Sequence, residues 1–244
     1  MRSKILKILV LVGLTALSFG SVPALAEDDA PSASGDIAFL SQYVWRGYGL
    51  SDDSIVIQPS ATVSYKGFSF NLWGNLDMDN LFTNDSEFNE TDMTLSYDWS
   101  MDSLSLGIGY IYYGLDSVED TKEFYFSISC DTILSPSLTI YRDIDAFPGF
   151  YANFGIGHSF AFSDDLALDL SASFGYYDVD NYSEFHDGSV SASISFPVGE
   201  YMSITPSLVY SFALTDESET NIKGTSVVAD SDYIFGGICF SIAF

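Results

Sequence analysis

Apolar and polar residues alternate along most of this chain, and the alternation is clearest after Lys66-Gly67. Phe68, Phe70 and Leu72 are each separated by one polar residue. Successive side chains of a strand point to opposite faces, so a period of two indicates a strand with one apolar and one polar face. A two-residue linker ending in glycine between two such segments is typical of a β-hairpin turn.

The same alternation recurs in further segments of similar length. The expected strands are 36–48, 55–65, 68–77, 91–99, 104–113, 123–131, 137–144, 149–160, 166–177, 188–196, 202–214 and 232–244. About ten residues is the length with which a tilted strand crosses a bilayer, and an even number of strands fits an outer-membrane barrel. We therefore predict an all-β chain, a transmembrane antiparallel up-and-down β-barrel of about twelve strands, in residues 36–244.

The chain begins with the pattern of a secretory signal peptide. Three basic residues precede a short apolar stretch, and residues 24–26 have the A-x-A form of a cleavage site. We predict a cleaved signal peptide in 1–26 and a flexible periplasmic lead-in in 27–35. The expected location is the outer membrane of a Gram-negative bacterium.

The two ends of the predicted barrel differ in their connections. Short turns such as Lys66-Gly67 alternate with longer, acidic connections such as 78–90, 178–187 and 215–231. Barrels of this class have short periplasmic turns and longer outer loops, so both termini are expected on the periplasmic side. The last strand ends at Phe244, which looks like the signal recognised by the barrel assembly machinery. The expected partners are therefore this machinery and outer-membrane lipid.

The chain is strongly acidic. It has 34 Asp and Glu against 8 Lys and Arg, a formal net charge of −26. This balance argues against nucleic acid as a partner, because phosphate binding needs basic patches, and it favours attraction of cations. The two cysteines are too few for a disulfide framework.

Aromatic residues make up 16% of the chain, and many fall near the predicted strand ends. Rings with one apolar and one wet side favour the membrane interface. The predicted aromatic girdle comprises Tyr43, Trp45, Tyr110, Tyr112, Tyr176, Tyr210, Trp99 and Phe244. In this interpretation Tyr43 and Trp45 face lipid on the first strand, and Arg46 faces the lumen.

The inward phase of the strands suggests which residues line a pore. The predicted pore-lining residues are Arg46, Asp92, Asp98, Asp131 and Asp169. Carboxylates around a lumen favour cations through the local potential. Two alternatives remain open: Arg46 either shapes a constriction inside the barrel or anchors the rim among lipid headgroups, and the interior either holds a water path or is plugged by side chains.

The sequence predicts no catalytic residue, no metal site and no cofactor. His158 and Ser159 are neighbours on a strand and point apart, so they form no dyad. Acidic loops could bind divalent cations, but the spacing of an EF-hand is missing. The sequence therefore predicts that the protein is not an enzyme.

Three stretches carry a resemblance to a known family. "SQYVWRGYGLSDD", followed by "QPSATVSYKGFSFNLWGN", resembles the amino-terminal half-signature of the TorF porin family, and so does the later "SCDTILSPSLTIYRDID". The resemblance implies an outer-membrane barrel with a pore, and it supplies neither catalytic residues nor a substrate. The predicted function is passive diffusion of small solutes or cations through an acidic lumen. The alternative is a non-transporting surface barrel whose acidic loops bind divalent cations or partners, and a lipid-modifying enzyme is less favoured.

Overall fold

The computed structural model describes residues 30–80, 85–116, 118–163 and 166–244. The predicted signal peptide, 1–26, lies outside the described residues. Within them, no helix has the length and apolar character needed to cross a bilayer, a finding that does not bear on spanning strands.

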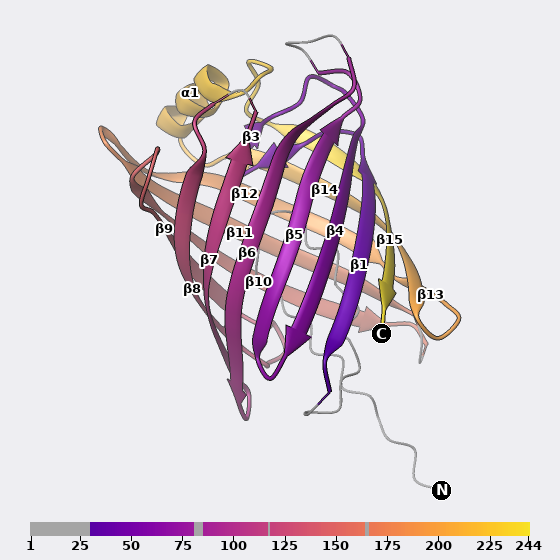
Figure 1. The fold of residues 1–244 in the computed structure, drawn as a ribbon. Coiled ribbons are helices and arrows are strands. Elements are labelled where there is room, and N and C mark those ends of the chain that lie inside the picture. Colours follow the sequence, from indigo (N-terminus) through magenta and orange to yellow (C-terminus); the bar gives the residue numbers. More distant parts are fainter. Residues whose placement is uncertain (1–29, 81–84, 117, 164–165) are drawn as a thin grey trace, which may run out of the picture.

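The described residues form a closed antiparallel barrel (Figure 1). Its twelve long strands are β1 (Ser32–Leu40), β4 (Val56–Tyr65), β5 (Phe68–Asp77), β6 (Glu87–Met101), β7 (Leu104–Leu115), β8 (Thr121–Cys130), β9 (Ser137–Asp143), β10 (Gly149–Ala161), β11 (Ala167–Val179), β12 (Tyr182–Ile194), β14 (Met202–Ala213) and β15 (Tyr233–Ala243). The short β13 (Phe196–Val198) continues β12 along β14. Each long strand pairs with its neighbours in sequence, and β1 closes the barrel against β15. The predicted fold class and strand number are confirmed.

Two predicted segments have wrong boundaries. The first strand begins at Ser32, inside the expected lead-in, and ends at Leu40 instead of continuing to residue 48. The expected outer loop 178–187 is mostly strand, because β11 and β12 extend to a tight turn around Asp180. Its polar residues on both faces suggested a loop, whereas a strand pair that projects into water needs no apolar face.

The connections divide the barrel into two ends, here called the turn end and the loop end. At the turn end, Lys66 and Gly67 have φ values of 50° and 83°, as a two-residue hairpin turn requires. The C-terminal residue lies at this end (Figure 1). The loop end carries the two longest connections, residues 41–55 and 214–232, and the second of these contains helix α1 (Asp216–Thr225). The predicted alternation of short and long connections holds for these two and fails between β11 and β12, which a tight turn joins.

The outer face of the barrel is a continuous apolar surface. Outward side chains such as Leu95, Ile108, Val190 and Leu208 are exposed by 46–58%. An apolar surface of this extent would be abnormal on a soluble monomer, and it is the surface that a bilayer covers on a transmembrane barrel. Six residues of the predicted girdle lie on this outer face: Tyr110, Tyr112, Tyr176, Tyr210, Trp99 and Phe244.

An arginine placed on this surface is expected to destabilise the barrel. Val190→Arg should lower the free energy of unfolding by about 2–4 kcal/mol if it lies near the bilayer midplane, because the charge must enter hydrocarbon. The matched control is Ser191→Arg, one residue further on and facing the lumen, which should lose less than half as much. Urea denaturation in lipid vesicles, followed by tryptophan fluorescence, measures both, and an equal loss would contradict the assignment of the two faces.

Candidate functional site

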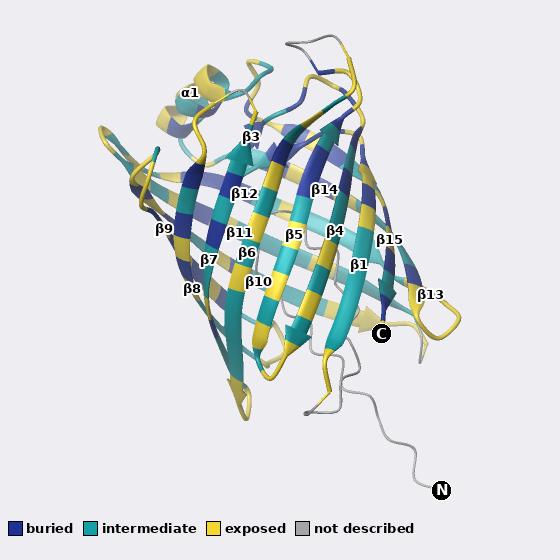
Figure 2. Ribbon diagram, viewed as in Figure 1, coloured by how far each residue is buried: buried dark blue, intermediate teal, exposed yellow. Residues whose placement is uncertain are grey.

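Residues 41–54 fold back into the barrel at the loop end instead of crossing the bilayer. They carry a small antiparallel pair, β2 (Val44–Trp45) and β3 (Tyr48–Gly49), and are called the inner hairpin here. The side chains of Val44 and Tyr48 pack against Val209 and Phe235, which point inward from the wall. Most buried residues lie in the loop-end half of the barrel, and a smaller group lies on β14 and β15 toward the turn end (Figure 2).

The tip of the inner hairpin is a tight turn made by Arg46 and Gly47. Their φ values are 48° and 81°, in the left-handed region. Glycine is required at the second position for space as well, since a Cβ there would lie 2.8 Å from the Cβ of Asp187 and 3.1 Å from Cδ1 of Ile222. Arginine at the first position is unusual, because such turns favour asparagine, aspartate or glycine there.

Arg46 forms a buried ion pair with Glu123 on β8. Its Nη1 and Nη2 atoms donate to Oε1 and Oε2 of Glu123, both at 2.8 Å, and the two side chains are 1% and 4% exposed. The hydroxyl of Tyr113 donates to Oε2 at 2.8 Å. Paired charge-assisted hydrogen bonds of this kind are among the strongest in proteins and fix the orientation of both planar groups.

Aromatic rings surround the same guanidinium. The Cζ atom of Arg46 lies 4.3 Å from the ring centroid of Trp45, 4.6 Å from that of Tyr141 and 4.4 Å from that of Tyr151. Cations favour the negative faces of such rings, and the attraction grows when water is excluded. Tyr113, Glu123, Tyr141 and Tyr151 are called the tyrosine cage here.

The remaining contacts of the inner hairpin fix it to the wall. Tyr43 packs in a buried cluster with Leu40 and Val56, and its ring centroid lies 5.8 Å from that of Trp73. Ser54 donates a hydrogen bond to Asp77 at the end of β5. The base of the hairpin is therefore attached to the wall as well as its tip.

Helix α1 covers the inner hairpin from the loop end (Figure 1). Thr215 caps its first turn, and the fully buried Ile222 packs against the hairpin cluster. The Tyr48 hydroxyl donates to Oδ1 of Asn221 at 2.8 Å, and the Gly49 N–H donates to Oγ of Ser226 at 3.0 Å. The helix and the inner hairpin thus form one closure over the loop-end half.

The lumen toward the turn end has a different lining. Inward hydroxyls pair across neighbouring strands, with Oγ–Oγ distances of 2.7 Å between Ser171 and Ser191 and 2.9 Å between Ser173 and Ser189. These residues are half-buried, unlike the aromatic residues at the loop end. Toward the turn end of β14 and β15, inward hydroxyl side chains such as Ser203, Thr205 and Ser241 are buried. The lining of the interior therefore changes along the barrel axis from hydroxyl to aromatic side chains.

Of the four aspartates predicted to line the pore, three face inward and one lies outside the barrel wall. Asp92, Asp98 and Asp169 face inward, Asp98 accepting a hydrogen bond from Ser96. Asp92 Oδ1 is buried and accepts no hydrogen bond from the described residues. Asp131 is exposed in the turn after β8, because that strand ends at Cys130, so its assignment to the barrel wall is wrong.

Basic residues are almost confined to the surface. Lys66 lies in a turn, Lys223 lies on α1, Lys122 pairs with Asp145 at the rim, and Arg142 packs over an outward ring. Among the described lysines and arginines, Arg46 is thus the one inside the barrel, and Glu123 neutralises it. This favours the lumen interpretation of Arg46 over the rim anchor.

The prediction that Tyr43 and Trp45 face lipid is wrong. Tyr43 is 5% exposed in the interior, and the Trp45 ring contacts Tyr113, with a centroid distance of 6.1 Å. The chain leaves the wall after Leu40. The stretch from Tyr43 to Trp45 is apolar at consecutive positions, so it lacks the alternation that a lipid-facing strand needs.

Sequence reasoning missed Glu123 and Tyr141, although a signal for both was present. Asp131 was given the inward phase, and an even spacing puts Glu123 on the same face of that segment. Leu138 and Ile140 share an apolar face in the sequence, which implies that Tyr141 points to the opposite, inward side. The structure confirms these directions, with Glu123 3% and Tyr141 2% exposed.

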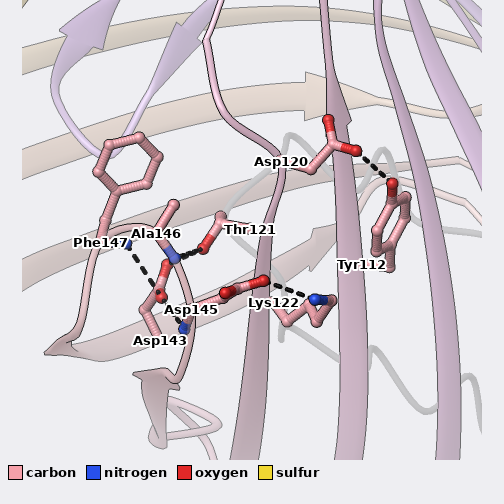
Figure 3. A network of polar contacts seen from close by, with 8 residues as sticks. All are labelled: Tyr112, Asp120, Thr121, Lys122, Asp143, Asp145, Ala146 and Phe147. Atoms are coloured by element: carbon pink, nitrogen blue, oxygen red, sulfur yellow. Dashed lines mark hydrogen bonds and ion pairs between the residues drawn. The ribbon is translucent and has the colours of Figure 1, made fainter.

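The rim beside the cage is ordered by a separate polar network (Figure 3). Asp143 accepts the Thr121 hydroxyl at 2.7 Å and the N–H groups of Asp145 and Phe147 at 2.9 and 3.3 Å. These bonds fold the connection between β9 and β10. Nearby, hydrogen bonds from the Tyr112 hydroxyl and the Leu115 N–H lower the pKa of Asp120.

Neither a metal site nor a dyad emerges from the described part of the chain. No three His, Cys, Asp or Glu side chains in it are grouped so that they could hold a metal ion. His158 lies on the outward phase of β10, and its Nδ1 is 2.6 Å from the carbonyl oxygen of Ile133. Ser159 points to the other side of the strand.

The fold defines this chain as a transmembrane β-barrel of the outer-membrane type. It is similar to the KdgM porin, with a TM-score of 0.57 and 12% identity over 86% of this chain and 99% of that chain. It is also similar to an outer membrane channel from Pseudomonas putida F1, with a TM-score of 0.53 and 8% identity over 90% of this chain and 97% of that chain. At these identities the likeness concerns the fold.

Comparison of the sequence with known families and proteins assigns the chain to no family. No family model matches the chain, and no curated protein matches it. The resemblance to the TorF family therefore stays a prediction, while the structural neighbours support the fold of an outer-membrane barrel.

Proposed function

We propose that this protein is a channel in the outer membrane of a Gram-negative bacterium, through which small solutes diffuse passively with a preference for cations. The observation that carries the proposal is the charge inside the barrel. Arg46, the basic side chain found there among the described residues, is neutralised by Glu123, whereas Asp98 and Asp169 face the polar lumen without a basic partner. A lumen with this imbalance concentrates cations and repels anions.

The inner hairpin sets the narrowest section of this channel. It fills the loop-end half with Tyr43, Trp45 and Arg46, and α1 covers it. A solute that enters from the turn end meets hydroxyls and carboxylates first and the tyrosine cage last. The bore at the cage therefore decides the conductance.

The proposal is tested in planar bilayers with the refolded protein. Discrete conductance with a reversal potential that gives a higher permeability to K⁺ than to Cl⁻ is expected across a KCl gradient. Anion preference would contradict it. Heat-modifiable migration on a gel establishes beforehand that the barrel has refolded.

Removal of the luminal carboxylates should weaken the preference for cations. The double variant Asp98→Asn and Asp169→Asn is expected to shift the reversal potential toward zero while the channel still conducts. The matched control neutralises two carboxylates in turn-end connections, Asp102→Asn and Asp131→Asn. At 1 M KCl exposed charges are screened over about 3 Å, so the control should change selectivity little. An equal shift of the reversal potential in both variants would contradict this prediction, because charges at the turn-end mouth would then set the selectivity as much as those in the lumen.

A second candidate is a barrel that does not conduct at rest. The filled loop-end half favours it, because the hairpin and α1 together occupy that section. In that case the intact protein stays silent in bilayers, and a variant without the inner hairpin conducts.

A further inference from the structure

The tyrosine cage belongs to the barrel wall and not to the hairpin that fills it. Tyr113 lies on β7, Glu123 on β8, Tyr141 on β9 and Tyr151 on β10, so four consecutive strands supply one residue each. Tyr141 is the cross-strand partner of both Tyr151 and Tyr125. The backbone ladder therefore fixes the strand positions of the cage residues independently of the inner hairpin.

A tight turn at the tip of the hairpin does not by itself require an arginine or a cage around it. The turn at Arg46 and Gly47 would form more readily with asparagine at the first position, since Arg46 has a φ of 48°. Arginine also loses much side-chain freedom when it is fixed. The turn itself therefore does not select this residue, and its contacts with the cage do.

The chemistry of the cage fits one class of ligand. A carboxylate presents two oxygens to the guanidinium, each at 2.8 Å from one of its nitrogens. Two wall rings, Tyr141 and Tyr151, have their centroids 4.6 and 4.4 Å from the same group. A planar, weakly hydrated cation with two parallel N–H donors matches this arrangement, whereas an ammonium ion is a compact and strongly hydrated point charge.

We propose that the tyrosine cage is a recognition site for solutes that carry a guanidinium group, and that Arg46 occupies it as an internal substitute for the solute. The inference rests on the proposed channel function, since it names the class of solute that the channel selects. A guanidinium solute arriving from the polar half of the lumen competes with Arg46 for Glu123. Its binding removes the anchor at the tip of the hairpin and widens the narrowest section.

The first experiment measures binding without any need for conductance. In Arg46→Ala the cage loses its internal occupant, and millimolar methylguanidinium should bind and raise the thermal midpoint of the refolded barrel. In the double variant Arg46→Ala and Glu123→Gln the affinity should be lower by about tenfold or more, because hydrogen bonds to a charged partner are lost. Methylammonium at the same concentration is the ligand control. Equal affinity in the two variants, or an equal response to methylammonium, would overturn the inference.

The second experiment separates this inference from the channel function. The reversal potential is measured with methylguanidinium chloride on one side of the bilayer and methylammonium chloride on the other. We expect the intact protein to favour methylguanidinium and the double variant to lose that preference. Conductance with the same permeability ratio in both proteins overturns the guanidinium site and leaves the channel. If no protein conducts, the channel function fails, and the binding experiment alone decides about the cage.

Discussion

Replacing Glu123 by alanine is expected to lower the free energy of unfolding by about 3–5 kcal/mol, because it leaves the charge of Arg46 buried without its partner. The two side chains are 1% and 4% exposed, so water cannot take over the role of the carboxylate. The Tyr113 hydroxyl loses its acceptor in the same variant. Urea denaturation in lipid vesicles, followed by tryptophan fluorescence, measures the change.

Two variants control this experiment. Lys122→Ala removes an ion pair whose side chains are 39% and 44% exposed, so the loss should stay under about 1 kcal/mol. The joint replacement Arg46→Met and Glu123→Leu removes both charges and keeps apolar volume, and it should recover most of the stability lost in Glu123→Ala. If Glu123→Ala is as mild as Lys122→Ala, the ion pair does not anchor the hairpin.

Removal of the inner hairpin should raise the single-channel conductance severalfold. Leu40 and Val56 are cross-strand partners, so the two strand ends lie about 5 Å apart. A linker of glycine and serine in place of residues 41–54 can therefore join β1 to β4 without distorting either strand. The loop-end half then loses the hairpin side chains, while α1 and the inward wall residues stay. Single-channel recording in planar bilayers measures the result.

The matched control replaces residues 144–148, a rim connection of the same end, with glycine and serine. This segment joins β9 to β10 and enters none of the buried clusters, so the conductance should not change. The idea that the hairpin sets the bore fails if the hairpin-free barrel refolds and conducts no better than the parent.

The barrel wall could be predicted from the sequence because a membrane acts on every strand in the same way. One face of each strand meets hydrocarbon and the other meets the lumen. Alternation such as that after Lys66-Gly67 therefore indicates both that a segment is a strand and which of its side chains face outward. Asp169, which the sequence predicts to face inward, is half-buried, and the next residue, Leu170, is exposed on the outer face.

The interior could not be predicted in the same way. An aromatic residue that fills a lumen looks like one that faces lipid, which is why Tyr43 and Trp45 were assigned to the wrong side. The pair of Arg46 and Glu123 joins residues 77 positions apart, and no local pattern reports such a contact. Helix α1 was missed although Thr215 and the acidic residues after it form an N-terminal capping pattern.

The path of ions through the polar lumen is tested most directly by chemical modification of single cysteines. Cys130 and Cys239 are first replaced by serine. Ser173→Cys then places a thiol inside the barrel, and its neighbour Ala172→Cys places one on the lipid face. A positively charged, membrane-impermeant thiol reagent added during recording should reduce the current of Ser173→Cys and leave that of Ala172→Cys unchanged. Current that responds equally in both variants, or in neither while mass spectrometry shows Ser173→Cys modified, would contradict an ion path through this lumen.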